Sequence, residues 1–262
     1  MDKISFDNHS VISLLDKFNK DGYLHLSNLI NENAIEDVSQ LLDQEVQFLD
    51  QAKSKSELEF AIDNDGVTLK EIESGNVRRT TKGNSILWNI LRLSEDLQFI
   101  LKALLKTDIL FMHMYPSPRI VRPGNLKALV PAHVDKSYNQ HLSNFLTLWT
   151  PIDSFEVGQG GLDVWPASHN EKYNQKIKSG LWYKGIITDE AIRKPIFVAR
   201  GDCVILHENI LHASRGNFSN KIRKSIDFRF FRSPKDTTKH YLDCSSWTVI
   251  DPMQKMKDFK NE

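Results

Sequence analysis

The feature that most constrains the fold is a change of pattern close to residue 105. Beyond that point, short runs of β-branched and aromatic residues alternate with turn-forming residues, a rhythm typical of antiparallel sandwiches and barrels. The runs expected to form strands cover residues 109–115, 144–150, 161–165, 196–199, 203–206 and 222–231. We therefore predict a mainly β chain with a jelly-roll barrel and helices packed outside it.

The residues before this point have helical spacing instead. Apolar side chains recur three and four positions apart in residues 10–19, from Asn33 to Leu49 and in residues 86–105, which predicts three amphipathic helices. Residues 23–30 fit a short strand between the first two helices. Asn33 begins a capping-box-like pair and is expected to mark the start of the second helix.

Residues 51–84 are too polar to assign to a helix or a strand. We expect them to form a loop that closes over a site, as lids commonly do. No linker divides the chain, so residues 1–262 are predicted to be a single domain. Its helical part covers about 1–105 and its jelly-roll core about 106–232.

Composition limits the partners. The formal net charge is zero, with 34 basic and 34 acidic residues, so no nucleic-acid partner is expected. No apolar run approaches the roughly 20 residues of a membrane span, and no signal-peptide core follows Met1, which predicts a cytoplasmic protein without a membrane partner. Cys203 and Cys244 are too few for a disulfide framework, and a chain of this length buries a sufficient core without one.

The chemistry centres on residues 131–135, Pro-Ala-His-Val-Asp. On an extended chain, side chains two positions apart lie on the same side, so His133 and Asp135 can bind one ion. A second imidazole from further along would complete a two-histidine, one-carboxylate set, which is diagnostic of non-haem Fe(II) oxygenases. A His-x-Asp triplet also arises by chance on solvated loops, so the prediction of a metal site depends on the downstream histidines.

Two histidines, His207 and His212, follow the strand expected at residues 203–206, and the residues alone leave both as candidates. Here the chain resembles the phytanoyl-CoA dioxygenase family. The distal pattern of that family is a histidine, a serine two residues later, an asparagine, and an arginine eleven residues after the histidine. The matching residues are His212, Ser214, Asn217 and Arg223, and further collinear matches lie at residues 18–29, 148–153 and 160–169.

The resemblance implies a double-stranded β-helix of the jelly-roll, cupin-like type and an enzyme that uses Fe(II), 2-oxoglutarate and O2. It implies that His133, Asp135 and His212 bind the iron. The family's spacing between the metal histidine and the arginine selects His212, because Arg223 lies eleven residues after it. His207 is therefore expected to support the metal ligands without binding the metal, or simply to pack.

The resemblance also implies that Arg223 binds the distal carboxylate of 2-oxoglutarate. Arginine suits this role because its planar fork meets a carboxylate bidentately and stays charged when buried. Ser214 and Trp149 match positions that contact the co-substrate, although Trp149 also suits plain core packing.

The last predicted strand adds a polar face. Arg223, Ser225, Asp227 and Arg229 alternate with the residues of the opposite face. Such a face is natural for a strand that lines a polar cavity, and a solvent-facing strand is the alternative.

Three residues are candidates for contacts to substrate, namely Lys136, Tyr138 and Arg229. Lys136 and Tyr138 directly follow the metal motif, and Arg229 lies on the polar face of the last strand. Further cations, Arg119, Arg122 and Lys127, precede the metal motif. This clustering favours a small anionic metabolite, whose identity the sequence leaves open together with the oligomeric state.

Asp135 separates the competing functions. A halogenase of this fold would have alanine or glycine in place of the carboxylate, so hydroxylation or a related oxidation is favoured. A zinc-dependent hydrolase would bind its metal through the same three residues. That reaction, however, has no evident use for Ser214 and Arg223. A non-catalytic jelly-roll binding protein leaves the metal ligands unexplained.

Overall fold

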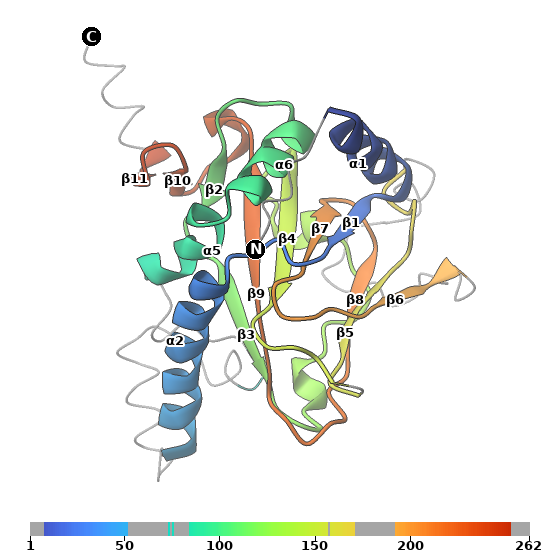
Figure 1. The fold of residues 1–262 in the computed structure, drawn as a ribbon, viewed down its shortest axis with the longest axis vertical. Coiled ribbons are helices and arrows are strands. Elements are labelled where there is room, and N and C mark those ends of the chain that lie inside the picture. Colours follow the sequence, from blue (N-terminus) through green and yellow to red (C-terminus); the bar gives the residue numbers. More distant parts are fainter. Residues whose placement is uncertain are drawn as a thin grey trace.

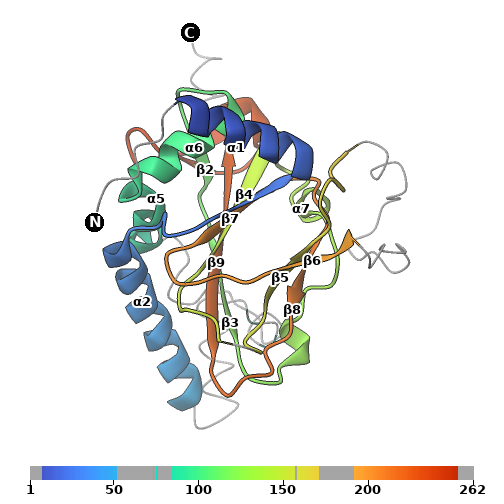
Figure 2. The same ribbon diagram turned by 45° about the vertical axis from the view of Figure 1, so that its right-hand side comes forward.

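The computed structural model of the chain describes residues 8–51, 73, 75, 84–156, 158–170 and 192–252 (Figure 1). The lid expected at residues 51–84 lies almost entirely outside the described residues. Within them, the strands form two antiparallel sheets that face one another, with helices along one side of the larger sheet (Figures 1 and 2).

The larger sheet has eight strands in an antiparallel arrangement. Its central strand, β9 (Arg223–Phe231), pairs with β4 along one edge and with β2 and β3 along the other. The strand order is β1 (Tyr23–Leu26), β7 (Cys203–His207), β4 (Phe145–Pro151), β9, β2 (Phe111–His113), β10 (Tyr241–Asp243) and β11 (Thr248–Ile250), with β3 (Ser117–Val121) beside β9.

The smaller sheet has the order β6 (Lys194–Ile196), β5 (Gly161–Val164) and β8 (His212–Arg215). Its apolar side chains pack against those of the larger sheet in a cluster that includes Trp149, Leu162 and Val204. β8 therefore lies opposite the inner face of the larger sheet (Figure 2), which brings residues from both sheets to one interior.

Helices cover the outer face of the larger sheet (Figure 1). They are α1 (Asn8–Asp21), α2 (Glu32–Gln51), η1 (Ser85–Trp88), α5 (Asn89–Arg92) and α6 (Glu95–Leu105). In β4, Leu146 and Leu148 join the helices in one apolar core. Thr147 and Trp149 alternate with them and point to the interior, because successive side chains of a strand lie on opposite faces. Short helices, η2 (Leu126–Ala128), α7 (Asp135–Tyr138) and η4 (Pro234–Asp236), occur in the connections.

Two details of the helices differ from the sequence predictions. The side chain of Asn31, not Asn33, accepts hydrogen bonds from the first backbone N–H groups of α2. The single helix expected at 86–105 is broken before Ser94, whose backbone leaves the helical region at φ −116° and ψ 79°. The Ser94 hydroxyl accepts a hydrogen bond from the backbone N–H of Asn31 at 3.0 Å. This contact links the residue before α6 to the residue before α2.

The sheets also extend beyond the predicted jelly-roll core of 106–232. β1 enters the larger sheet from the amino-terminal part, and β10 and β11 extend it after residue 240. β3 and β8 were not anticipated, and β6 begins two residues before the run expected at 196–199. Among the described helices, none has the length and hydropathy that crossing a bilayer requires.

Candidate active site

A two-residue β-bridge brings two imidazoles side by side. His133 and His212 exchange backbone hydrogen bonds of 2.9 and 3.0 Å, which pairs the loop before α7 with the start of β8. Paired residues on adjacent chains project their side chains to the same face. The two ring centroids consequently lie 4.2 Å apart.

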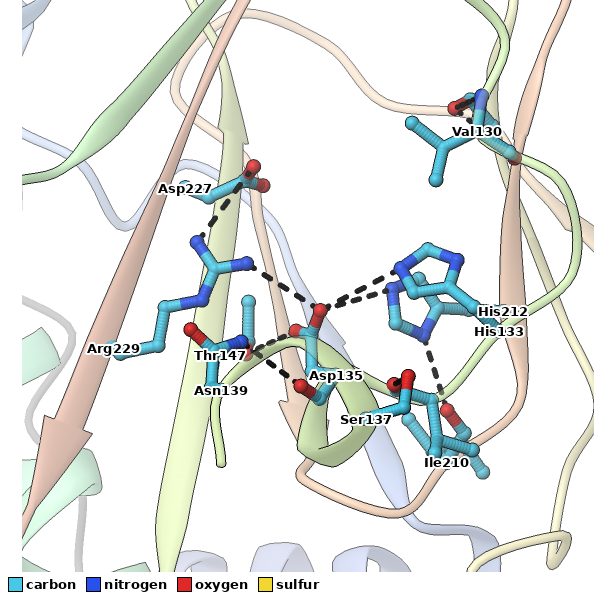
Figure 3. A network of polar contacts seen from close by, with 12 residues as sticks. Val130, His133, Asp135, Ser137, Asn139, Thr147, Ile210, His212, Asp227 and Arg229 are labelled. Atoms are coloured by element: carbon cyan, nitrogen blue, oxygen red, sulfur yellow. Dashed lines mark hydrogen bonds and ion pairs between the residues drawn. The ribbon is translucent and has the colours of Figure 1, made fainter. Parts of the chain in front are cut away.

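The third candidate ligand follows from the same segment. Asp135 begins α7 two residues after His133, and its Oδ1 lies 3.6 Å from His133 Nε2 and 3.9 Å from His212 Nε2. The three side chains are buried, and their ligand atoms lie within 4.8 Å of one another. The His-x-Asp motif and the downstream His212 thus converge on one point (Figure 3).

Backbone carbonyls fix the orientation of both imidazoles. His133 Nδ1 donates to the Pro131 carbonyl at 2.8 Å, and His212 Nδ1 donates to the Ile210 carbonyl at 3.1 Å. Because a carbonyl only accepts, each Nε2 is left with its lone pair toward Asp135. Burial, reinforced by His133, lowers the pKa of His212 to about 4, so this imidazole is neutral near pH 7.

The carboxylate of Asp135 is held from two sides (Figure 3). Thr147 donates its hydroxyl to Oδ2, and Arg229 Nη2 lies 3.4 Å from Oδ1. Burial acts to raise the pKa of Asp135, but Arg229 and the histidines outweigh it and hold the pKa well below its ordinary value. Arg229 Nη1 also lies 3.8 Å from Asp227, whose own pKa is raised by burial.

A cavity of about 390 Å³ contains this cluster. Its wall includes the metal-ligand candidates and the four inward side chains of β9, which are Arg223, Ser225, Asp227 and Arg229. The predicted polar face of β9 is therefore confirmed as a cavity wall. Leu162 and Leu206 supply apolar surface to the same cavity.

Arg223 lies in the cavity at the opposite end of β9 from Arg229. Its Nη1 donates to the Arg215 carbonyl at 2.8 Å, and its guanidinium lies 5.9 Å from the centre of the Phe155 ring. Gly160 has φ +105°, and a Cβ there would lie 2.9 Å from the Arg215 carbonyl oxygen and 2.3 Å from Nη1, so the position favours glycine. Burial, followed by repulsion from Arg119, lowers the pKa of Arg223 to about 10, and its buried Nε has no hydrogen-bond partner among the described residues.

Ser214 and Trp149 both line the cavity. The Ser214 hydroxyl accepts from the backbone N–H of Val130 at 2.9 Å, and this contact fixes the loop that leads to the metal motif. Trp149 stands edge-on to Phe155, with ring centroids 5.8 Å apart. Phe155 therefore contacts both the Trp149 ring and the guanidinium of Arg223.

Two of the three residues predicted to contact substrate line the cavity, and the third does not. Tyr138 lines the cavity, and its ring meets the His133 ring edge-on at 5.1 Å. Arg229 lines it too, with its guanidinium between Asp135 and Asp227. Lys136 is not a cavity residue, because α7 turns its ammonium to the Leu142 carbonyl and to Glu208. The expectation that Lys136 faces the pocket is therefore corrected.

His207 does not join the metal-ligand cluster. Leu206 faces the cavity, so His207, as the next residue of β7, faces the other side. There its ring lies 5.0 Å from His169 and 6.1 Å from Phe18, and its Nδ1 accepts from the Asn209 backbone N–H at 3.1 Å. It packs between α1 and the sheet.

This packing gives His207 an effect on acid stability. Burial, aided by His169, lowers its pKa to about 4, whereas an unfolded histidine titrates at roughly 6.5. Between these values the unfolded chain binds the extra proton, so the free energy of unfolding falls as pH drops from about 6.5 toward 4. We expect His207→Asn, which keeps an acceptor near Nδ1, to flatten this dependence by up to about 1.4 kcal/mol per pH unit.

Urea denaturation of metal-free protein at several pH values measures that slope. The comparison uses slopes because the substitution also changes packing against Phe18 and His169. His113 and His212 also have pKa values lowered to about 4 by burial, so part of the acid dependence persists. Equal slopes for the two proteins would show that His207 does not titrate in this range.

Thr147 is a positioning residue that the sequence analysis missed. Because Thr147 holds Asp135 Oδ2, Oδ1 is the oxygen turned toward the two Nε2 atoms. Partners that orient metal ligands typically contribute about 10–100-fold to metal affinity. We therefore expect Thr147→Val to weaken Fe(II) binding by about 10–100-fold, measured by anaerobic equilibrium dialysis.

Thr147→Ser is the matched control, because it keeps the hydroxyl and removes only a methyl group. It should bind Fe(II) with nearly unchanged affinity. If valine and serine variants bound Fe(II) equally well, the hydroxyl would have no role in orienting Asp135.

Other residues of the site also escaped the sequence analysis. Gly160 and Phe155 contact Arg223 from the loop before β5, a relation that follows only from the folded chain. Thr147 carried a usable signal, because it is a polar residue between Leu146 and Leu148 in a strand whose neighbours are apolar. An inward polar residue in such a strand indicates a partner in the interior.

Comparison with known families matches the chain to one of them. The family model for phytanoyl-CoA dioxygenase (PhyH) matches residues 18–225, which is more than half of the chain. No curated protein matches the chain in sequence.

Several solved structures share the fold. The epimerase SnoN from nogalamycin biosynthesis, in complex with Fe3+, α-ketoglutarate and nogalamycin RO, aligns at TM-score 0.60 and 14% identity over 90% of this chain and 87% of that one. EvdO2 from Micromonospora carbonacea var. aurantiaca, complexed with 2-oxoglutarate, aligns at TM-score 0.56 and 17% identity over 89% of this chain and 94% of that one. EctD from S. alaskensis, with 2-oxoglutarate and 5-hydroxyectoine, aligns at TM-score 0.59 and 14% identity over 87% of this chain and 79% of that one. These likenesses confirm the jelly-roll prediction.

Proposed function

This chain belongs to the phytanoyl-CoA dioxygenase family of non-haem Fe(II)- and 2-oxoglutarate-dependent oxygenases, and we propose that His133, Asp135 and His212 bind its iron. The observation that carries this proposal is the convergence of three buried ligand atoms on the wall of a cavity that also contains Arg223. Two imidazoles and one carboxylate suit Fe(II) and leave positions open on the metal.

The residues present fit the iron. Both imidazoles have their protons fixed on Nδ1 by backbone carbonyls, so their Nε2 atoms are ready to bind a cation without losing a proton. Asp135 stays ionised because Arg229 lies beside it. When bound, iron and 2-oxoglutarate together supply an oxidant made from O2, with 2-oxoglutarate converted to succinate and carbon dioxide.

The residues also fit the co-substrate. We propose that Arg223 binds the distal carboxylate of 2-oxoglutarate, because its buried Nε lacks a partner among the described residues and its guanidinium lies in the same cavity as the iron ligands. A carboxylate satisfies a guanidinium through two parallel hydrogen bonds. Ser214 and Trp149 line the same cavity, and we propose that they contribute a hydroxyl and an indole to the co-substrate site.

The substrate is proposed to be a small molecule. A cavity of about 390 Å³ is within the usual size of small-ligand pockets, and Leu162, Leu206 and Trp149 give its wall apolar surface. SnoN and EctD hold small molecules in their structures, nogalamycin RO and 5-hydroxyectoine. Because Asp135 is present, the reaction proposed is hydroxylation or a related oxidation.

A metabolite screen for succinate tests this function. Purified protein is loaded with Fe(II) and 2-oxoglutarate without oxygen, exposed to O2 with metabolite mixtures, and assayed for succinate. We expect succinate that depends on Fe(II), on 2-oxoglutarate and on one mixture, and none from His212→Gln. Zn(II)-loaded protein that hydrolyses an ester while Fe(II)-loaded protein makes no succinate would establish the hydrolase alternative.

A further inference from the structure

The inner face of β9 carries an acid that the proposed function does not use. Asp227 lines the cavity two positions before Arg229, and its side chain is 17% exposed. It lies directly opposite Trp149 of β4, and its carboxylate interacts electrostatically with Asp135 and His133. Asp227 is therefore a cavity residue close to the proposed metal ligands (Figure 3).

The carboxylate of Asp227 lacks a hydrogen-bond donor. Its ion pair with Arg229 Nη1 spans 3.8 Å, and no N–H or O–H group of the described residues donates to it. Asp135 differs, because Thr147 donates its hydroxyl to that carboxylate. Buried carboxylates normally accept hydrogen bonds, and without such donors burial raises the pKa of Asp227. A ligand in the cavity can supply the missing donor.

Ser225 offers a second polar group beside this acid. It precedes Asp227 by two residues on the same face of β9, a rise of about 7 Å along the strand, and it lines the same cavity. The residue is 2% exposed, yet its hydroxyl makes no hydrogen bond with the described part of the chain. A hydroxyl both donates and accepts. Ser225 and Asp227 therefore present a donor and an acceptor that the described residues leave unpaired.

The chemistry of the Ser225–Asp227 pair selects among three kinds of ligand group. An oxyanion only accepts hydrogen bonds, so it would leave Asp227 without a donor and repel it. An ammonium group donates to the carboxylate but brings a second cation beside Arg229. A hydroxyl group donates to Asp227, accepts from Ser225 and adds no charge. The pair therefore suits a hydroxyl group best.

The cations that suggested an anionic substrate have partners of their own. Arg229 lies between two carboxylates, and Arg119 Nη2 donates to the Ala128 carbonyl at 3.1 Å. The other three form ion pairs, Arg122 with Asp50 at 2.6 Å, Lys127 with Glu73 at 3.0 Å and Lys136 with Glu208 at 3.6 Å. The described structure therefore favours a neutral polar group over an oxyanion.

We propose that Asp227 and Ser225 bind a hydroxyl group of a neutral alcohol substrate beside the metal centre. This proposal rests on the proposed function and names the substrate class. The carbon skeleton of such an alcohol would contact the apolar surface of the same cavity, which Trp149, Leu162 and Leu206 supply. Two hydrogen bonds to one hydroxyl would fix which part of the skeleton lies toward the iron.

The test uses matched probes that differ in one functional group. They are the alcohol, ketone, primary amine and carboxylic acid built on cyclohexane and on decalin. Protein loaded with Fe(II) and saturating 2-oxoglutarate, without oxygen, is titrated with each probe by calorimetry. Because 2-oxoglutarate then occupies the co-substrate site, the probes report the rest of the cavity. We expect the wild type to bind the alcohols more tightly than the other members of each set.

Two variants assign that preference to the pair. Asp227→Asn keeps the shape of the side chain but replaces a charged hydrogen bond with a neutral one, so it should bind the alcohols roughly 5–10-fold more weakly. Ser225→Ala removes a neutral hydrogen bond and should cost roughly 2–10-fold. The ketones accept but do not donate, so Asp227→Asn should bind them no more weakly than the wild type does.

Glu156→Gln is the matched control, because it removes an exposed acid that pairs with Lys221 and does not line the cavity. It should bind the alcohols as the wild type does. The affinity for 2-oxoglutarate should be the same in the wild type and in all three variants. Equal affinity also shows that the variants fold and keep the co-substrate site.

The outcomes separate this proposal from the proposed function. The substrate proposal fails if the alcohols do not bind the loaded wild type, or if Asp227→Asn binds them equally well. It also fails if the acids or amines bind the wild type most tightly, or if Asp227→Asn and Ser225→Ala weaken 2-oxoglutarate instead of the alcohols. If Fe(II)-loaded wild type does not bind 2-oxoglutarate at all, the proposed function itself fails.

Discussion

Replacing Asp135 with asparagine, or His212 with glutamine, is expected to weaken Fe(II) binding by more than about 100-fold and to abolish succinate formation. Residues that merely orient a metal ligand contribute about 10–100-fold, so losing a ligand exceeds that range. Asparagine removes the negative charge between the two Nε2 atoms and leaves its carbonyl as a weaker ligand. Anaerobic equilibrium dialysis with metal analysis measures the affinity.

Two features keep this test decisive. Asparagine retains the shape of Asp135 and an acceptor for Thr147, whereas alanine would leave Arg229 with only Asp227 beside it. His207→Asn is the control histidine variant, because His207 lies on the other face of β7. This variant should bind Fe(II) as the wild type does. Iron retained by His212→Gln and lost by His207→Asn would overturn the ligand assignment.

The metal cluster was predictable because its information is local. His133 and Asp135 are two residues apart, and this spacing alone places them on one side of the chain. His212 needed the spacing to Arg223 for its selection over His207. The structure places His212 in the cluster through a backbone bridge to His133, a pairing of residues 79 positions apart that no local pattern encodes.

The surroundings of the cluster were less predictable because they depend on the register of distant strands. Thr147 lies opposite Arg229, and Trp149 opposite Asp227, only because β4 pairs with β9 in one register. A shift by one residue would place all of these side chains on the outer face. The sequence showed the polar alternation of β9 but not which acid Arg229 would meet.

The predictions for Lys136 and for residues 86–105 were wrong because a tertiary contact overrode a local preference. Lys136 follows the metal motif closely, yet the single turn of α7 rotates it away from the cavity to Glu208. Residues 86–105 have continuous helical spacing, yet Ser94 leaves the helix and its hydroxyl binds the start of α2. The acid beside Lys136 and the amide that binds Ser94 lie more than 60 positions away in the chain, although the Leu142 carbonyl that Lys136 also binds is only six positions away.

Replacing Arg223 with glutamine is expected to weaken 2-oxoglutarate binding by about 10–100-fold while Fe(II) binding stays unchanged. A charged hydrogen bond contributes roughly 1.5–3 kcal/mol, and each 1.4 kcal/mol is about tenfold in affinity. Arg223→Lys should recover little, because an ammonium lacks the planar fork that meets a carboxylate. Calorimetric titration of Fe(II)-loaded protein without oxygen measures both variants.

The surroundings of Arg223 give a second, independent variant of this prediction. Gly160 has φ +105°, and a side chain there would displace the guanidinium from the Arg215 carbonyl. Gly160→Ala should therefore weaken 2-oxoglutarate binding although Arg223 is intact. Arg215→Gln is the matched control, because it changes only a side chain that pairs with Asp163 and keeps the carbonyl. Unchanged 2-oxoglutarate affinity in both Arg223→Gln and Gly160→Ala would remove Arg223 from the co-substrate site and leave the iron ligands as assigned.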